Sequence, residues 1–179
     1  DNMAKQDLAV AEYFRATLRN TIVPTMIKGG IKENIIPSEC EAVFDCRILP
    51  GENQNSLLNE IKRALSNAAI ELSKLEFEFI VTSEPSESPM NTRLYSRIQE
   101  TIHKLEPNAD IVPLMATGGT DSRFLRKLGC ICYGFHPVKT DMPLNEYLRM
   151  GHGIDERISI NNLVFGTKVL HELVKEFLC

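Results

Sequence analysis

Residues 116–126 combine glycines with polar and cationic side chains and read ATGGTDSRFLR, which we expect at a strand-to-helix junction. Two glycines let the backbone approach a ligand closely, and the N–H groups at the start of a helix attract an anion. Thr120 can donate a hydroxyl hydrogen bond, while Arg123 and Arg126 can bind a carboxylate through paired N–H groups. The segment therefore predicts a carboxylate or oxyanion site. A capped helix after a tight turn, with Asp121 or Thr120 as the cap, is the simpler explanation of the same residues.

A second candidate site lies at residues 151–158, which read GHGIDERI and place a histidine between two glycines. The small neighbours leave the imidazole of His152 unobstructed, which suits a metal ligand or a proton carrier. We expect this segment in a polar loop just before the last helix. A solvated loop histidine is the simpler explanation of one such residue, and the Asp-Glu-Arg run at residues 155–157 also fits an exposed charge cluster.

A third candidate site lies at residues 32–47, which read KENIIPSECEAVFDCR. Asn34 precedes an apolar pair and a proline that restricts the loop, and Arg47 falls on the polar face of the strand that follows. Both side chains are able to bind a carboxylate or a carbonyl of a substrate. A loop-capping asparagine and an exposed strand arginine are the commoner explanations.

The first half of the chain must position Asn34 and Arg47. Its hydrophobic spacing predicts a helix over residues 8–18, strands over 21–27 and 41–49, a helix over 53–72 and an alternating strand over 75–82. Pro24 predicts an edge or a bulge in the first of these strands. This order is a split βαβ unit that lacks its first strand, which we expect to precede residue 1.

The polar sequence SEPSESP at residues 83–89 reads as a domain boundary. We therefore expect an α+β domain over residues 1–87 and an α/β domain over residues 88–179. Helices and continuous apolar strands alternate in the second domain, as in a parallel sheet that is buried on both faces. The expected elements are helices over 91–105 and 120–128, strands over 110–115 and 130–135, and a last helix capped by Asn161.

Composition restricts the class of protein. Hydrophobic residues make up 43% and charged residues 25%, which excludes disordered and fibrous classes. The net charge of −4 argues against a nucleic-acid binder. The sequence shows no run of about eighteen apolar residues, as a membrane-spanning helix requires, and no signal-peptide pattern at its start. We therefore expect no membrane partner and a cytoplasmic location.

Taken together, the motifs are more specific than any one alone. GGIKENIIPSECEAVFDCRILPGE, TGGTDSRFLRKLG, YGFHP and GHGIDERISINNL, in this order, resemble the zinc-dependent peptidase family of aminoacylase, acetylornithine deacetylase, succinyl-diaminopimelate desuccinylase, carboxypeptidase S and glutamate carboxypeptidase. The resemblance implies an α/β catalytic domain interrupted by a ferredoxin-like lid that also forms the homodimer. Residues 1–87 correspond to most of the lid, and residues 88–179 to the C-terminal part of the catalytic domain.

The resemblance also implies roles for five residues. His152 corresponds to a zinc ligand, in an intact enzyme that holds two zinc ions or, in their place, cobalt or manganese. Asn34 and Arg47 would reach the substrate from the lid, and Thr120 and Arg126 would hold its carboxylate or the oxyanion. The implied reaction is hydrolysis of N-acyl amino acids or dipeptides by metal-activated water.

The chain also departs from the pattern of that family. Its His-x-Asp ligand pair and paired glutamates are absent from this sequence, and the chain opens Asp1-Asn2-Met3. We therefore expect a piece of a longer enzyme that binds zinc poorly and hydrolyses nothing by itself. The alternative is a non-catalytic module that dimerises through its sheet and binds a small anion at residues 118–120.

Overall fold

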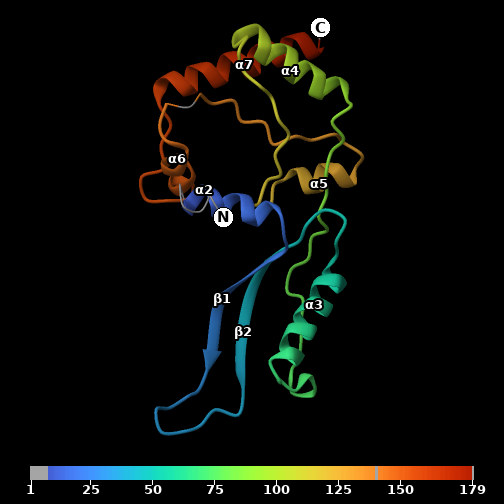
Figure 1. Ribbon diagram of the computed structural model, residues 1–179, viewed down its shortest axis with the longest axis vertical. Helices are drawn as coiled ribbons and strands as arrows, with labels where there is room; N and C mark the ends of the chain where they lie inside the picture. The colour runs from blue at the N-terminus through green and yellow to red at the C-terminus, as the bar shows by residue number, and fades with distance from the viewer. Residues whose placement is uncertain (1–7, 140, 179) are drawn as a thin grey trace. The chain divides into compact units, whose positions relative to one another are not determined.

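The computed structural model describes residues 8–139 and 141–178 (Figure 1). These residues divide into two compact units. One unit runs from Arg15 to Ser86, and the other holds the residues from Glu87 onward together with those up to Phe14. The first helix, α2 (Leu8–Thr17), therefore contributes residues to both units. The chain leaves the first unit between Ser86 and Glu87, within the polar SEPSESP sequence.

The Arg15–Ser86 unit contains an antiparallel pair of strands, β1 (Thr21–Gly29) and β2 (Cys40–Arg47), which form a long hairpin (Figure 1). The register is irregular between Pro24 and Met26. Because proline has no N–H to donate, it cannot continue a ladder, and the bulge predicted at Pro24 is confirmed. The hydroxyl of Thr25, within this irregularity, donates to the Val43 carbonyl at 3.1 Å.

Helix α3 (Gln54–Asn67) follows the hairpin and starts with a reciprocal cap. The side-chain oxygen of Asn53 accepts hydrogen bonds from the backbone N–H groups of Asn55 and Ser56, at 2.9 and 3.0 Å. The Ser56 hydroxyl accepts in return from the Asn53 N–H at 3.1 Å. Such a cap satisfies donors that a helix start leaves without intrahelical partners. A short 3-10 helix, η1 (Leu72–Lys74), comes after α3.

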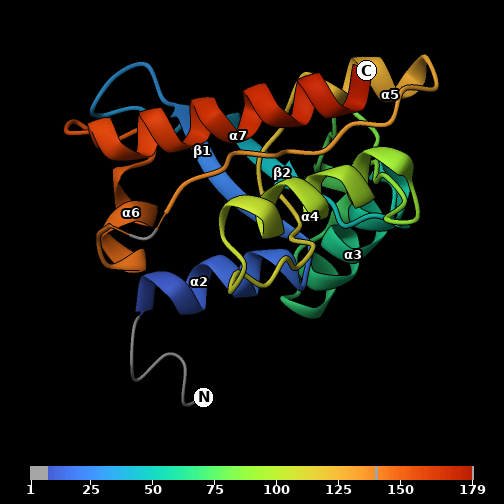
Figure 2. The same cartoon turned by 90° about the horizontal axis from the view of Figure 1, so that it is seen from above.

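From Glu87 onward, the other unit contains helices α4 (Arg93–Leu105), α5 (Ser122–Lys127), α6 (Leu144–Met150) and α7 (Ile160–Leu178). Helices α4 and α7 lie side by side (Figure 2). Their facing side chains are buried: Ile98, Thr101 and Ile102 on α4, and Val169 and Leu173 on α7. This apolar contact is the core that holds the two longest helices of the unit together.

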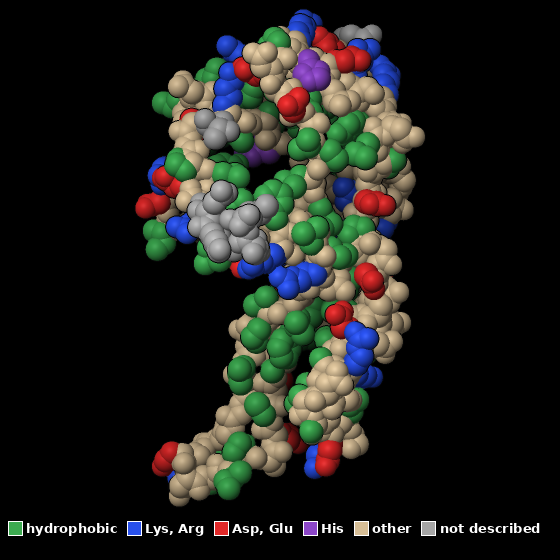
Figure 3. Space-filling model, viewed as in Figure 1, with side chains coloured by type: hydrophobic (Ala, Val, Ile, Leu, Met, Phe, Trp, Pro, Cys, Tyr) green, Lys and Arg blue, Asp and Glu red, His purple; other side chains and the backbone are tan. Residues whose placement is uncertain are grey.

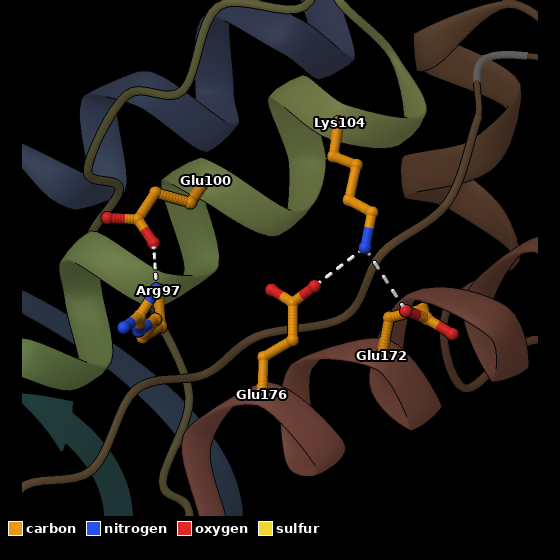
Figure 4. A network of polar contacts seen from close by, with 5 residues as sticks. All are labelled: Arg97, Glu100, Lys104, Glu172 and Glu176. Atoms are coloured by element: carbon orange, nitrogen blue, oxygen red, sulfur yellow. Dashed lines mark hydrogen bonds and ion pairs between the residues drawn. The ribbon is translucent and has the colours of Figure 1, made fainter. Parts of the chain in front are cut away.

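Charged side chains also join α4 to α7 (Figure 4). The Lys104 ammonium lies 2.7 Å from a Glu176 carboxylate oxygen and 3.4 Å from one of Glu172. The hydrogen bond to Glu176 raises the pKa of Lys104, and the same bond lowers the pKa of Glu176. Arg97 and Glu100, 2.5 Å apart, form a pair within α4 alone. All these groups are solvent-accessible, so each ion pair adds little to stability.

The start of α7 is fastened by Ser159 and Asn162. The Ser159 hydroxyl accepts from the Asn162 N–H at 3.1 Å, so Ser159 caps the helix and the predicted cap at Asn161 is wrong. The Asn162 side chain is buried and makes two hydrogen bonds to one backbone residue. Its oxygen accepts from the Lys139 N–H at 2.6 Å, and its nitrogen donates to the Lys139 carbonyl at 3.0 Å.

The mixed α/β class predicted from the sequence is confirmed, but the sheet is smaller than expected. Across residues 8–139 and 141–178, the sheet has two strands. The segments expected as strands at 75–82, 110–115 and 130–135 do not form ladders with any described strand. Alternating or continuous apolar residues report which faces can be buried, whereas a strand also needs a partner for its backbone groups. Phe79, Val81 and Val112 in these segments are exposed, at 47%, 83% and 75%.

Candidate functional site

His152 lies in a turn that follows α6, and its side chain is exposed. Its backbone φ is +61°, in the left-handed region that glycine adopts without a steric cost. For a residue with a Cβ atom this conformation costs about 1–2 kcal/mol. Behind it, the Gly153 N–H donates to the Met150 carbonyl at 2.8 Å and so closes the turn onto α6. A strained backbone at an exposed imidazole is typical of a functional position.

Arg157 stabilises the same turn from its far side. Its guanidinium lies 3.1 Å from a carboxylate oxygen of Glu146 on α6 and also donates to the Asp155 carbonyl at 3.1 Å. An open depression of about 670 Å³ lies beside these residues, lined by Pro143, Asn145, Glu146, Arg149, Met150, Gly153, Ile154, Asp155 and Arg157. The Asp-Glu-Arg run that follows His152 thus includes a residue that holds the turn in place.

The residues that the structure describes do not complete a metal site. Within them, no group of three or more histidine, cysteine, aspartate or glutamate side chains is placed to hold an ion. A catalytic zinc site usually takes three protein ligands and a water. His152 therefore fits such a site only as one contributor among ligands from elsewhere.

Thr120 and Arg126 flank the short helix α5. Thr120 is exposed at its start, and its carbonyl accepts from the Arg123 N–H at 3.2 Å. The N-cap residue Asp121 makes no side-chain capping hydrogen bond. A Cβ atom at Gly118 would meet nothing within 4 Å. The loop before α5 is thus open to solvent, as an anion-binding loop requires, but α5 is not capped by Asp121 as the simpler explanation supposed.

Arg126 is partly buried at the other end of α5, where two of its nitrogens make hydrogen bonds. Nε donates to the Ser88 hydroxyl at 3.1 Å, and Nη2 donates to the Cys132 carbonyl at 2.7 Å. Sequence reasoning missed Ser88, since a serine in a polar boundary segment shows no periodic pattern. Arg123, by contrast, stacks on the neighbouring Phe124 ring, with its guanidinium carbon 4.6 Å from the ring centre.

Asn34 and Arg47 lie at opposite ends of the β1–β2 hairpin. Asn34 is exposed in the loop that connects the strands, next to the Gly29–Cys40 pair, whereas Arg47 pairs with Thr21 at the far end. Seven residue steps at about 3.3 Å each separate these ends by about 23 Å. The hairpin by itself therefore does not bring Asn34 and Arg47 together. Thr120, Arg126 and His152 belong to the other unit.

Arg47 forms an ion pair with Asp45, the next residue but one on the same strand face. Nε lies 2.7 Å from one carboxylate oxygen, and Nη2 donates to the other at 2.9 Å. Such a two-point pair holds the guanidinium in a defined plane. Burial raises the pKa of the Cys46 thiol, which lies between Asp45 and Arg47 in the sequence. The negative charge of Asp45 raises this pKa further, by a smaller amount. Cys46 therefore remains a neutral thiol at neutral pH.

Comparison with known proteins places these residues in a family. Residues 3–73 match the model of the peptidase dimerisation domain, M20_dimer. Over 163 residues the chain is 32% identical to N-fatty-acyl-amino acid synthase/hydrolase PM20D1 of Mus musculus, covering 89% of this chain and 31% of that protein. No solved structure matches, and none of the described helices is both long and apolar enough to span a membrane.

Two further relatives come from Dictyostelium discoideum. Probable carboxypeptidase S-like 2 is 28% identical over 160 residues, with 89% of this chain and 30% of that protein covered. Aminoacylase-1 is 30% identical over 139 residues, with 69% of this chain and 32% of that protein covered. The chain thus spans about a third of the length of these relatives. It belongs to the M20 peptidase family, of the aminoacylase and carboxypeptidase type.

Proposed function

We propose that this chain is part of a metal-dependent amidohydrolase that hydrolyses N-acyl amino acids or dipeptides. The observation that carries the proposal is the similarity over 89% of the chain to a protein named as an N-fatty-acyl-amino acid synthase/hydrolase. The relatives named as an aminoacylase and a carboxypeptidase S-like protein fit the same class of reaction, cleavage of an amide bond next to a carboxylate.

His152 is the metal ligand in this proposal. Its exposed imidazole and strained backbone support a role that the fold alone does not require. When bound, two zinc ions, or cobalt or manganese in their place, would supply an activated water for attack on the amide carbonyl. His152 supplies one neutral nitrogen ligand, and the other ligands and the proton-carrying base come from residues beyond this chain. We therefore expect the 179-residue polypeptide alone to be inactive.

Four residues bind the substrate in this proposal. Thr120 and Arg126, at the two ends of α5, hold the substrate carboxylate or the oxyanion that forms on the amide carbonyl. Asn34 and Arg47 contribute from the β1–β2 hairpin, each at its own end. Cationic and hydrogen-bonding groups suit both a carboxylate and a negatively charged intermediate.

Residues 1–87 are the dimerisation lid in this proposal, and residues 88–179 are the C-terminal part of the catalytic domain. The match to a peptidase dimerisation domain over residues 3–73 supports a homodimer formed through the lid. Hydrophobic side chains at the surface of the hairpin also support it (Figure 3), among them Val23, Met26 and Ile27, which are 54%, 65% and 76% exposed. The predicted cytoplasmic location stays a prediction.

A His152→Ala variant of the complete gene product tests the proposal. We expect hydrolysis of N-acyl amino acids to fall by more than about a hundredfold, because even losses in the outer shell of a metal site cost 10–100-fold. Metal analysis should show reduced metal content in the same variant. The matched control is His103→Ala, which removes an exposed imidazole from α4 and should change neither quantity.

Equal activity and metal content in the His152→Ala variant and the wild type would contradict the catalytic assignment. The non-catalytic alternative predicts that outcome, because an anion-binding dimerisation module has no use for this imidazole. The inactivity of the 179-residue polypeptide is checked in the same assay with added zinc. Measurable turnover there would show that the chain needs no further ligands.

A further inference from the structure

Ser88, the second residue of the segment that starts at Glu87, has a hydroxyl that makes three hydrogen bonds. Its hydroxyl oxygen accepts from Arg126 Nε at 3.1 Å and from the Cys132 N–H at 3.2 Å. The hydroxyl also donates to the Cys132 carbonyl at 2.8 Å. A serine hydroxyl has one donor and two acceptor sites, so these three bonds use all of them.

Arg126 closes the network, because its Nη2 donates to the same Cys132 carbonyl at 2.7 Å. Two different nitrogens of the guanidinium are thereby fixed, one by Ser88 and one by Cys132. Because the guanidinium is planar and presents its donors in a fixed fork, hydrogen bonds to two of its nitrogens restrain the orientation of the whole group. All three residues are partly buried, so water competes less with these bonds than it would at an open surface.

The backbone around Ser88 is held by contacts that do not involve its hydroxyl. The Tyr133 hydroxyl donates to the Pro89 carbonyl at 2.5 Å and lies 2.5 Å from the Thr92 hydroxyl. Thr92 caps α4 by accepting from the Tyr95 N–H at 3.1 Å, and the rings of Tyr95 and Tyr133 meet edge to face at 5.6 Å. Removing the Ser88 hydroxyl would thus leave this segment attached and affect chiefly the Arg126 guanidinium.

We propose that Ser88 is a positioning residue that sets the plane of the Arg126 guanidinium for substrate recognition. The inference rests on the proposed function, in which Arg126 binds the substrate carboxylate. A two-point bond between a guanidinium and a carboxylate requires the two planar groups to be aligned. With the Nε bond lost, the remaining contacts of Arg126 hold the guanidinium plane less tightly in that alignment, and capture of carboxylate substrates weakens.

The experiment measures kcat and KM of the complete gene product with an N-acyl amino acid and with the matching N-acyl amino acid carboxamide. Loss of one hydrogen bond in Ser88→Ala should raise KM for the carboxylate substrate about three- to tenfold, with little change in kcat. KM for the carboxamide should not change. Ser88→Thr keeps the hydroxyl and should restore KM to near the wild-type value. Ser83→Ala, at an exposed serine five positions earlier, is the matched control.

Two results would overturn the role of Ser88 while leaving the proposed function intact. One is an unchanged KM in Ser88→Ala when Arg126→Ala raises KM for the carboxylate substrate. The other is an equal rise in KM for the carboxylate and the carboxamide, since damage to the fold would affect both. An unchanged KM in Arg126→Ala would instead remove the substrate role of Arg126, and the inference about Ser88 with it.

Discussion

At the scale of single residues, the structure shows which candidate side chains are held by neighbouring groups and which are exposed. Asp45 holds Arg47, and Ser88 with Cys132 holds Arg126. His152, by contrast, keeps a conformation that a glycine would adopt more easily. Strain that does not serve packing is expected where chemistry requires a particular side chain.

Gly166 gives a prediction about packing at this scale. A Cβ atom added there would lie 2.9 Å from the carbonyl oxygen of Pro137, which is a backbone atom that cannot move aside easily. Overpacking costs about 1–3 kcal/mol, and the gain in helix propensity offsets about 1 kcal/mol of that cost. We therefore expect Gly166→Ala to lower the free energy of unfolding by up to about 2 kcal/mol.

Chemical denaturation of the 179-residue chain checks this prediction. The matched control is Gly134→Ala, because a Cβ atom there would meet nothing within 4 Å. A Gly166→Ala variant that is more stable than the wild type would show that the Pro137 segment can move away from α7 at little cost.

Residue types identified the candidate residues, whose roles stay a prediction, but residue spacing did not predict their geometry. The glycine-flanked His152 and the open loop before Thr120 were evident from the sequence. The sequence did not show that Asn34 and Arg47 lie at opposite ends of the hairpin, because their positions depend on strand register and loop length. The partners of Arg126 were also hidden, since Ser88 is distant in sequence and carries no hydrophobic signal.

At the scale of elements, α4 and α7 are joined by an apolar contact and by the Lys104 pair with Glu172 and Glu176. Hydrophobic periodicity predicted both helices to within a few residues, because each must bury one face. The seven-residue helix α6 was missed, since so short a segment shows little periodicity. The opposite error occurred at residues 75–82, 110–115 and 130–135, which the sequence predicted as strands. Their hydrophobic pattern suits a strand, but they pair with no described strand.

The charge pair makes the contact between α4 and α7 dependent on pH. The pKa of Glu176 is lowered from its ordinary value of 4.5, so its contribution to stability is present above that value and is lost as the pH falls through the folded-state pKa. The pKa of Lys104 is raised, so its contribution persists up to its ordinary value of 10.5 and is lost above it. We expect Glu176→Gln to lower Tm at pH 7 and low salt, and the difference from the wild type to shrink in acid.

Thermal unfolding at several pH values checks this expectation. High salt should shrink the same difference, because solvent-accessible charges are screened. Glu100→Gln, which breaks a pair within α4 only, serves as the control and should change Tm less. A difference that is equal at pH 7 and in acid would mean that Glu176 acts through packing and not through its charge.

At the scale of the whole molecule, the proposed homodimer depends on apolar side chains of the hairpin. We expect Ile27→Lys, at a position that is 76% exposed on β1, to weaken dimerisation of the complete gene product by at least about tenfold, because a charge would be buried without a partner. Analytical ultracentrifugation over a range of concentrations measures the change. A dimer of unchanged affinity would place the interface elsewhere.

The control for this variant is Ile154→Lys. Ile154 is fully exposed, at 104%, and lies in the other unit beside His152. Since the proposed interface does not include that unit, the lysine there should leave the dimer unchanged. The dimerisation-domain match over residues 3–73 supports this choice of control.

One side chain at the start of α7 holds both backbone groups of Lys139. In a β-sheet, many backbone hydrogen bonds join two strands, so the strands stay paired when one of these bonds is lost. Here a single amide side chain, Asn162, satisfies both the N–H and the carbonyl of Lys139. Truncation of Asn162 to alanine therefore removes both bonds at once, whereas an aspartate, which lacks the amide's donor, could keep only the bond from the Lys139 N–H.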